Sequence, residues 1–338
     1  MSKKAAIAAA LAAATLVFGV TFASASSSSG SLKGAGSSFV APLVSQWQAN
    51  YKSAQITYGA IGSGAGIAAL IARSVDFGAS DAPLTKDQAS SCNGCEQIPW
   101  AVAATSIPYH VPNVSYGLKL TGKILASIYL GHITKWNDAA IKKINPGVNL
   151  PDLKITPVWR SDASGTSYNF TEYLSRVSPE WKRKVGVGTQ PAFPVGIGGN
   201  HSGGLAGVVS RTDGAIGYVD EAYSLKNGFK VAKVQNKAGK FQLPGLVGVK
   251  AAVATVHKVP ANGAISIVNP PKSAKLAYPI CTFTYVMVPL KSSKASMLKQ
   301  FISWAITSGQ SYAPALQFYP LPKFVRTADR TFISKIHS

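Results

Sequence analysis

The sequence predicts an α/β protein of about two domains. Short apolar runs alternate with segments of helical periodicity along most of the 338 residues, a pattern typical of strands followed by helices rather than of a β-sandwich. Behind an N-terminal leader, roughly 310 residues remain, which is enough chain for a substantial core and about two domains. Glycine- and serine-rich stretches precede several of the helical segments and indicate the loops between elements.

The leader has the three parts of a secretory signal peptide. Lys3 and Lys4 precede an alanine-rich apolar run that reaches Phe22, and residues 23–25 offer a small-x-small cleavage site. We therefore expect a signal peptide over residues 1–25, with a retained membrane anchor as the alternative. Because no cysteine stands at the cleavage site, lipid anchoring there is not indicated. The expected location is periplasmic or otherwise extracytoplasmic.

The first part of the chain is predicted to alternate strands and helices. Pro42 suits the first turn of a helix that carries Leu43, Trp47 and Tyr51 at a spacing of four residues. Further on, the pattern predicts a strand over 55–58, a glycine loop over 61–66, a helix over 67–73 and a strand over 75–79 that ends before Pro83.

The remaining elements follow from the same reasoning. The patterns predict helices over 121–129 and 137–144, a strand over 155–159, a helix over 165–177, a loop over 198–204 that precedes another helix, a turn and strand over 213–219, a strand over 282–288 and a helix over 295–307. Residues 225–275 are punctuated by Lys, Gly and Pro, and we expect hairpins and short helices there. The chain after residue 307 reads as a loop with a weak terminal segment.

The composition is strongly basic, with 34 Lys and Arg against 13 Asp and Glu and a formal net charge of +21. Such a charge is compatible with nucleic acid, an anionic surface or anionic ligands. The basic residues are scattered without a basic run interleaved with aromatics, so nucleic-acid binding is not expected. Scarce carboxylates also suggest the hypothesis of adaptation to acidic surroundings, with a flat stability profile between neutral and strongly acid pH.

The spacing of the cysteines and histidines does not predict a metal-binding site. Cys92 and Cys95 stand in C-N-G-C, which in an exported chain favours a small structural disulfide over a redox centre, and Cys281 is then a buried free thiol. The five histidines show no ligand spacing with each other or with the cysteines, so neither a metal nor another cofactor is expected.

Three segments share a plan that suits an anion. Residues 34–39, 61–66 and 160–166 each place small residues and hydroxyls directly before a predicted helix. The first N–H groups of a helix lack intrahelical partners, and the peptide dipoles leave partial positive charge there. The hydroxyls of Ser38, Ser63, Ser164 and Thr166 would add donors. Each serine or threonine alone is better explained as a helix N-cap, and only the three segments together, with an arginine nearby, favour an anion site.

Charged residues near these segments indicate which kind of anion would bind. Arg160 can offer a bidentate fork to an oxyanion, and Asp162 lies on the same side of a continuing strand, where it can orient the guanidinium; a surface ion pair is the alternative. Asp81 follows the strand over 75–79. An ionised carboxylate only accepts hydrogen bonds, so Asp81 fits an anion site only if the anion carries a proton. Phosphate does so at neutral pH and sulfate does not, so the pattern favours phosphate.

The motifs together resemble a known family. In order and spacing, the chain resembles the periplasmic phosphate-binding protein of the bacterial high-affinity phosphate ABC transporter over about residues 34–224 closely and over the last sixty loosely. The motifs are G-A-G-S-S-F-V-A-P, I-G-S-G-A-G, V-D-F-G-A-S-D-A-P-L, I-Y-L-G-H-I-T-K-W-N-D, W-R-S-D-A-S-G-T-S and G-A-I-G-Y-V-D.

The resemblance implies a type II periplasmic-binding-protein fold, in which two hinged α/β domains hold phosphate in the cleft between them. It implies a discontinuous domain I of residues 26–104 plus 281–338 and a domain II of residues 105–280. Asp162 would support Arg160 by a salt bridge. The implied phosphate-binding residues are Ser38, Phe39 (through its backbone N–H), Ser63, Asp81, Arg160, Ser164, Gly165 and Thr166.

The resemblance also implies partners and shows departures. The implied partners are inorganic phosphate and the membrane permease and ATPase subunits of a phosphate ABC transporter, and we expect a monomer. The family usually has Thr at Ser38, Pro at Val40, and Ser-Gly where Gly64 and Ala65 stand. Ser38 keeps the hydroxyl, whereas the other two changes affect loop rigidity.

Two other function classes remain open from the sequence. A phosphate socket also suits a phosphatase or phosphotransferase, although the chain has no Gly-Lys-Ser/Thr nucleotide loop, no G-x-S-x-G elbow and no metal-ligand cluster. A phosphate-scavenging surface protein of the same fold, without a transporter, is the third possibility. The binding protein of a transporter is the preferred reading, and no enzyme activity is expected.

Overall fold

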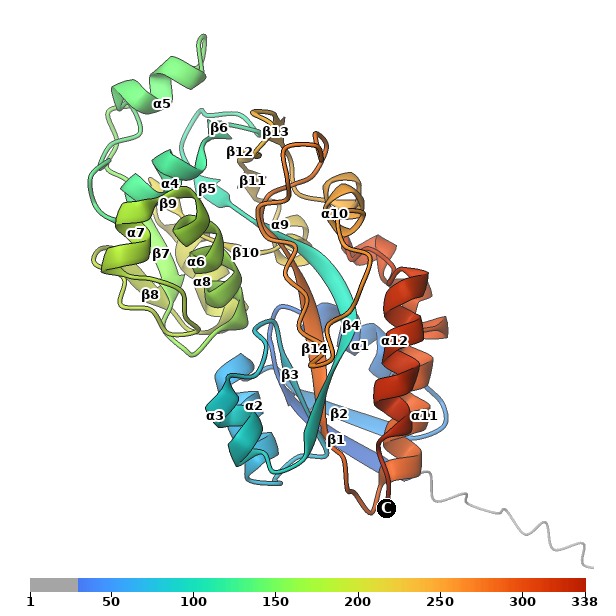
Figure 1. Ribbon diagram of the computed structural model, residues 1–338. Helices are drawn as coiled ribbons and strands as arrows, with labels where there is room; N and C mark the ends of the chain where they lie inside the picture. Colours follow the sequence, from blue (N-terminus) through green and yellow to red (C-terminus); the bar gives the residue numbers. More distant parts are fainter. Residues whose placement is uncertain (1–29) are drawn as a thin grey trace, which may run out of the picture.

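The computed structural model describes residues 30–338, which form two lobes that each surround a β-sheet (Figure 1). The first lobe holds a six-stranded sheet of order β10-β4-β14-β3-β1-β2. Its strands are β1 (Ser31–Gly36), β2 (Gln55–Gly59), β3 (Phe77–Ser80), β4 (Cys95–Ser106), β10 (Val219–Asp220) and β14 (Cys281–Pro289). Strands β1, β2 and β3 run parallel, and β14 lies antiparallel between β3 and β4.

Amphipathic helices complete the first lobe. They are α1 (Ala41–Asn50), α2 (Ser63–Ile71), α3 (Lys86–Ser91), α11 (Ala295–Ala305) and α12 (Lys323–Ser334), with the short 3-10 helices η1 (Ser308–Tyr312) and η2 (Pro314–Leu316). An aromatic cluster fills the core: Trp100 meets both Trp47 and Phe77, and Phe77 meets Phe301. This burial of large rings supplies much of the apolar contact between the sheet and its helices.

The second lobe holds a five-stranded sheet of order β11-β5-β9-β7-β8 and a three-stranded sheet of order β13-β12-β6. The strands are β5 (Pro108–His110), β6 (Lys119–Leu120), β7 (Thr156–Arg160), β8 (Ile197–Gly199), β9 (Ala215–Ile216), β11 (Lys230–Val231), β12 (Lys233–Gln235) and β13 (Phe241–Gln242). The helices are α4 (Gly122–Tyr129), α5 (Ala139–Ile144), α6 (Gly165–Val177), α7 (Pro179–Lys184), α8 (His201–Arg211), α9 (Glu221–Lys226) and α10 (Leu246–Val253). Stacked rings of Phe170, Tyr218 and Phe193 form its aromatic core.

The chain passes between the lobes near the ends of two long strands. Strand β4 ends at Ser106 and is followed at once by β5 of the second sheet, whereas β14 begins at Cys281 and pairs with β4 back to Cys95. Between β9 and β10 the chain crosses again, because β9 pairs within the second sheet and β10 pairs with the end of β4. Figure 1 shows β4 and β14 rising side by side from the first lobe toward the second.

Most expected elements are confirmed, with corrections at their ends. The glycine loop over 61–66 is shorter than expected because α2 already begins at Ser63, and the loop over 198–204 ends early because α8 begins at His201. The single strand expected over 213–219 is wrong: it is two short strands, β9 and β10, in different sheets. Gly66 lies inside this helix, where a Cβ would lie 2.3 Å from Gly36 Cα, so glycine allows α2 to pack closely on β1.

The expectation of a loop and weak segment at the end of the chain is also wrong. Residues 323–334 form the regular helix α12, which buries Val325, Phe332 and Ile333 against the first lobe. An aspartate, Asp329, lies on this same buried face, but the apolar residues Phe324, Val325, Ala328, Phe332 and Ile333 still follow the helical period. Residues 225–275 contain the expected hairpin of β12 and β13 and one short helix, α10.

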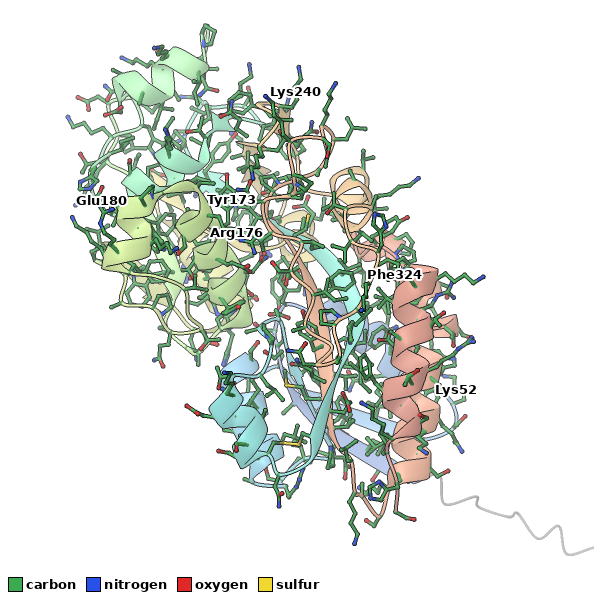
Figure 2. The ribbon with its side chains drawn as sticks, in the orientation of Figure 1. Lys52, Tyr173, Arg176, Glu180, Lys240 and Phe324 are labelled. Carbon is green, nitrogen blue, oxygen red and sulfur yellow. A yellow bond between two sulfur atoms is a disulfide. The ribbon has the colours of Figure 1, made fainter. Side chains whose placement is uncertain are left out.

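Side-chain chemistry in the described part agrees with the cysteine reading. Cys92 and Cys95 form a disulfide, and Cys281 is a buried free thiol. Figure 2 shows charged side chains such as Lys52, Glu180 and Lys240 projecting from the surface. None of the helices within residues 30–338 is long and apolar enough to cross a bilayer. The expected signal peptide lies outside the described residues.

Candidate anion-binding site between the two lobes

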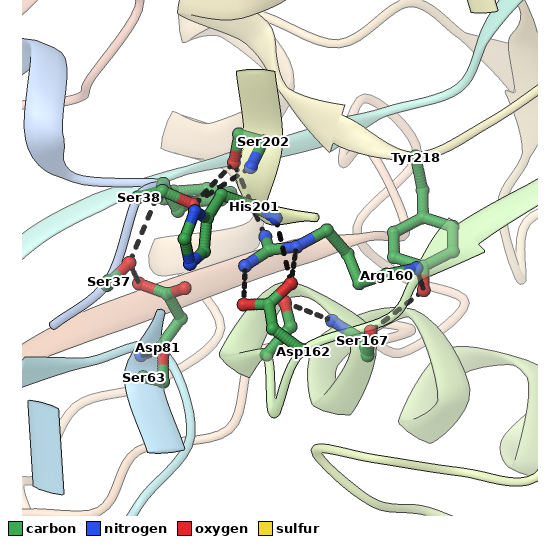
Figure 3. A network of polar contacts seen from close by, with 12 residues as sticks. Ser37, Ser38, Ser63, Asp81, Arg160, Asp162, Ser167, His201, Ser202 and Tyr218 are labelled. Carbon is green, nitrogen blue, oxygen red and sulfur yellow. Dashed lines mark hydrogen bonds and ion pairs between the residues drawn. The ribbon is translucent and has the colours of Figure 1, made fainter. Parts of the chain in front are cut away.

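Four helix N-termini converge where the lobes meet. Helix α1 follows Ser38, and α2 starts with Ser63 on the first lobe; α6 follows Ser164, and α8 starts with His201 on the second. Figure 3 shows that residues of all four segments face one another around Asp81 and Arg160. Every one of these helices points partial positive charge into the same space, which is the arrangement that an anion needs.

Asp81 lies at the floor of this space, directly after β3, and is 2% exposed. Burial raises its pKa to about 6, while the hydrogen bond from Ser37, the nearby hydroxyls of Thr284 and Thr166 and the charge of Arg160 lower it. Ser37 Oγ donates to Asp81 Oδ1 at 2.6 Å. The carboxylate is thus held ionised near neutral pH by donors that leave oxygen lone pairs for a further donor.

Arg160 ends strand β7 and is equally buried. Its Nε donates to Asp162 Oδ1 at 2.6 Å, and its Nη2 donates to Asp162 Oδ2. Burial alone would raise the pKa of Asp162, but the hydrogen bond and charge of Arg160, with the N–H of His201, lower it below its ordinary value. This bidentate pair confirms the expected salt bridge and fixes the plane of the guanidinium, so that Nη1 remains directed toward Ser202 at 3.4 Å.

The first turn of α6 supplies the hydroxyls of the second lobe. Ser164 is the N-cap, and its Oγ accepts from the backbone N–H of Ser167 at 3.2 Å, so the hydroxyl proton is left to donate elsewhere. Thr166 is 1% exposed, and its Oγ1 has no hydrogen-bond partner among residues 30–338. A buried hydroxyl without a partner is costly, and it indicates a site for a polar ligand.

Gly165 sits where the two lobes are in close contact. A Cβ on this residue would lie 2.6 Å from the backbone nitrogen of Asp81 and 2.7 Å from Ser63 Oγ. Side-chain atoms essentially never pack that closely, so only glycine allows the start of α6 to close on the Asp81 loop. The predicted residues Ser63, Asp81 and Gly165 are therefore brought together from three separate segments.

Ser38 and Phe39 are also placed at the junction. Ser38 Oγ lies 2.9 Å from Ser202 Oγ of the opposite lobe. The Phe39 backbone N–H donates to Ser37 Oγ at 3.0 Å, and the Phe39 ring packs edge-on against Phe318 in the core. The Phe39 N–H thus already has an acceptor in this structure, which an anion would have to replace or share.

The sequence reading omitted three neighbours of this site. Ser37 and Thr284 contact or approach Asp81, and Ser202 bridges to Ser38 and Arg160. Ser202 had a visible signal, because it lies in a glycine-rich stretch before a predicted helix, like the three segments that were chosen. Thr284 had none, since only the pairing of β14 with β3 brings it beside the Asp81 loop. Across residues 30–338, no group of three His, Cys, Asp or Glu could hold a metal ion.

Two α/β lobes joined by two long strands, with an anion socket between them, define a solute-binding protein. The sequence profile of the PBP superfamily domain matches residues 23–308. The phosphate-binding protein PstS of Xylella fastidiosa (strain Temecula1 / ATCC 700964) is 41% identical over 298 residues, covering 86% of this chain and 81% of the relative. PstS of Pasteurella multocida (strain Pm70) is 38% identical over 301 residues, covering 87% of each chain. The chain belongs to the PBP superfamily and, within it, to the PstS family of phosphate-binding proteins.

Solved structures confirm the fold. A high affinity periplasmic phosphate-binding protein, PfluDING, bound with phosphate, superposes with a TM-score of 0.75 at 20% identity and covers 89% of this chain and 93% of its own. A phosphate-binding protein from Stenotrophomonas maltophilia gives a TM-score of 0.71 at 23% identity with the same coverage. The expected two-domain α/β fold of periplasmic binding proteins is therefore confirmed.

Proposed function

We propose that this protein captures inorganic phosphate between its lobes and delivers it to an ABC permease for import. The convergence of Asp81 with Arg160 in one buried space carries the proposal, because it combines a bidentate donor for an oxyanion with an acceptor for the proton that phosphate retains. The names of the PstS relatives support phosphate as the ligand.

The proposed ligand contacts come from both lobes. From the first lobe, Ser38, the Phe39 N–H and Ser63 donate and Asp81 accepts. From the second, Arg160 donates with Asp162 holding its guanidinium, and Ser164, Gly165 and Thr166 donate through hydroxyls and backbone N–H groups at the start of α6. Since neither half-set is complete alone, phosphate gains its full set of bonds only when the lobes are together.

Selectivity against sulfate rests on Asp81 in this proposal. Fully ionised sulfate has no proton to offer, so its oxygens would face the lone pairs of a buried carboxylate. An unpaired buried acceptor facing an anion costs several kcal/mol, roughly a thousandfold or more in affinity. The positive surface speeds capture of any anion but does not distinguish phosphate from sulfate.

The proposed hinge follows the two strands at the lobe junction. Domain I comprises residues 26–104 and 281–338, and domain II comprises residues 105–280. The end of β4 and the start of β14 support these boundaries, because each strand end borders the second lobe. Bending at these two crossings, and at the crossing between β9 and β10, would open the socket without unfolding either sheet.

The remaining parts of the proposal concern the cell. The exported protein, cleaved after residue 25, acts as a monomer outside the cytoplasm and docks in its closed form on the permease, which works with an ATPase subunit. The alternative of a phosphate-ester hydrolase finds no support in the PstS relatives. The other alternative is a phosphate-scavenging protein without a transporter. Phosphate uptake into vesicles that carry the permease distinguishes it from the proposal, because only a transport protein would support uptake.

Small-angle scattering of the phosphate-stripped mature chain tests the capture mechanism. Titration with phosphate should reduce the radius of gyration and saturate at one phosphate per chain, while p-nitrophenyl phosphate should stay unhydrolysed. Hydrolysis that phosphate inhibits would favour the enzyme alternative. An unchanged scattering curve with bound phosphate would contradict closure, and an absence of binding would contradict the ligand.

A further inference from the structure

Ser202, the second residue of α8, links the two lobes across the socket. It is fully buried. Its backbone N–H donates to Ser38 Oγ at 3.0 Å, its Oγ lies 2.9 Å from Ser38 Oγ, and Arg160 Nη1 donates to its Oγ at 3.4 Å. Figure 3 shows these contacts from Ser202 to both neighbours. Ser202 thus contacts one proposed ligand residue from each lobe.

Counting protons and lone pairs limits what each hydroxyl can do. A serine hydroxyl has one proton and two acceptor lone pairs, whereas a guanidinium and a backbone N–H only donate. Ser202 Oγ therefore accepts from Arg160, and Ser38 Oγ accepts from the N–H of Ser202. The hydrogen bond between the two hydroxyls can run either way, from Ser38 to Ser202 or from Ser202 to Ser38.

The two directions differ in what remains for an anion. If Ser38 donates to Ser202, its only proton is used within the protein. If Ser202 donates to Ser38, both lone pairs of Ser38 Oγ are filled, by the N–H and the hydroxyl of Ser202. The Ser38 proton is then free and has no acceptor in Ser202, so it is available to a bound anion. An anion in the socket selects this second direction.

We propose that Ser202 is a positioning residue that makes the Ser38 hydroxyl a dedicated donor to bound phosphate. The inference deepens the proposed function and rests on it. Because Ser202 and Ser38 belong to different lobes, the donor is arranged only in the closed form. Ser202 therefore couples closure to ligand retention, and it acts on the escape of phosphate more than on its entry.

Binding of inorganic phosphate to Ser202→Ala tests this role. The substitution removes the hydroxyl and keeps the backbone N–H. We expect the Kd for phosphate to rise about tenfold, the effect of one hydrogen bond to a charged network, with the dissociation rate carrying most of the change. The matched control is Ser210→Ala on the same helix, where an exposed hydroxyl donates only to the carbonyl of Gly207; it should bind phosphate like the wild type.

A double-mutant cycle with Ser38→Ala separates positioning from a merely structural role. If Ser202 acts through Ser38, Ser202→Ala should weaken binding by less than about threefold in the Ser38→Ala background. Two results would overturn the inference and leave the proposed function intact, provided that the wild type binds phosphate. One is full additivity of the effects of Ser202→Ala and Ser38→Ala on the Kd. The other is a Ser202→Ala or Ser38→Ala variant that binds phosphate like the wild type. A wild type that fails to bind phosphate would overturn both. Thermal unfolding without phosphate shows that each variant folds.

Discussion

The backbone N–H of Gly64 donates to the carbonyl oxygen of Ala163 at 2.9 Å and so joins the first turn of α2 to the loop that precedes α6. A Cβ on Gly64 would lie 2.4 Å from the Cβ of Ala163. The alanine of the opposite lobe occupies the space that a side chain at residue 64 would need. The two residues thus complement each other in shape across the cleft.

This relationship predicts compensation between two substitutions. Gly64→Ser should weaken phosphate binding by about tenfold or more, because its side chain would collide with Ala163 only when the lobes close. Adding Ala163→Gly should restore most of the affinity. Calorimetric titration of both single variants and of the double variant checks this expectation. Equal affinity of Gly64→Ser and wild type would show that the lobes do not close to this distance.

Gly165→Ala should block closure more severely. Its methyl group would meet Ser63 Oγ and the backbone nitrogens of Asp81 and Ala82, and these backbone atoms cannot move as a flexible side chain could. We expect phosphate affinity to fall about a hundredfold or more, with unfolding of the ligand-free protein little changed. Gly203→Ala on α8 is the matched control, because a Cβ there would meet nothing within 4 Å. Unaltered affinity of Gly165→Ala would contradict the assigned role of this glycine.

The ligand-free protein should become more stable as the pH falls from about 9 to 4. Burial raises the pKa of Asp81 to about 6, of Glu221 to about 7 and of Asp329 to about 9. In the unfolded chain these groups titrate near 4, so within that window the folded state binds more protons and the free energy of unfolding rises as pH decreases. The lowered pKa of Asp162 acts in the opposite direction, but only below about pH 4.

Denaturant unfolding at several pH values measures this profile. The hypothesis of acid adaptation, drawn from the scarcity of carboxylates, predicted a free energy of unfolding that does not change with pH. The buried carboxyls instead predict a free energy of unfolding that rises as the pH falls. Asp329 offers a separate check, because neither of its carboxylate oxygens has a hydrogen-bond partner within residues 30–338. Asp329→Asn should lower the slope between about pH 4 and 9, where the folded carboxyl of Asp329 is protonated and the unfolded one is not. A wild-type stability that falls steadily on acidification from pH 7 would contradict the prediction.

Capture of phosphate should depend on salt through its association rate. With a net charge of +21, the field of the protein attracts anions over long distances at low ionic strength, whereas salt screens it beyond about 8 Å at physiological ionic strength. We expect the association rate to fall several-fold between low and high ionic strength. The dissociation rate, governed by the buried socket, should change much less. Stopped-flow mixing with phosphate measures both rates.

The sequence predicted the composition of the site better than its arrangement. Hydroxyls before helices and the Arg160 and Asp162 pair are local patterns, and each appears where expected. The contact of Ser202 with Ser38 depends on how two lobes meet, which no local pattern encodes. The position of Thr284 could not be predicted from a local pattern either, because it lies on β14, some two hundred residues after Asp81, and only the pairing of β14 with β3 brings it near Asp81. The helix α12 was missed although its apolar residues follow the helical period, so it was within reach of the sequence.

The most direct test of the account is calorimetric titration of the phosphate-stripped protein with phosphate and, separately, with sulfate, for the wild type and Asp81→Asn. The account predicts one tightly bound phosphate per wild-type chain with no heat from sulfate. In Asp81→Asn, where an amide can donate to a fully ionised anion, it predicts weaker discrimination with measurable sulfate binding. Equal binding of phosphate and sulfate by the wild type, or unchanged discrimination in Asp81→Asn, would contradict the claim that Asp81 selects phosphate through its proton.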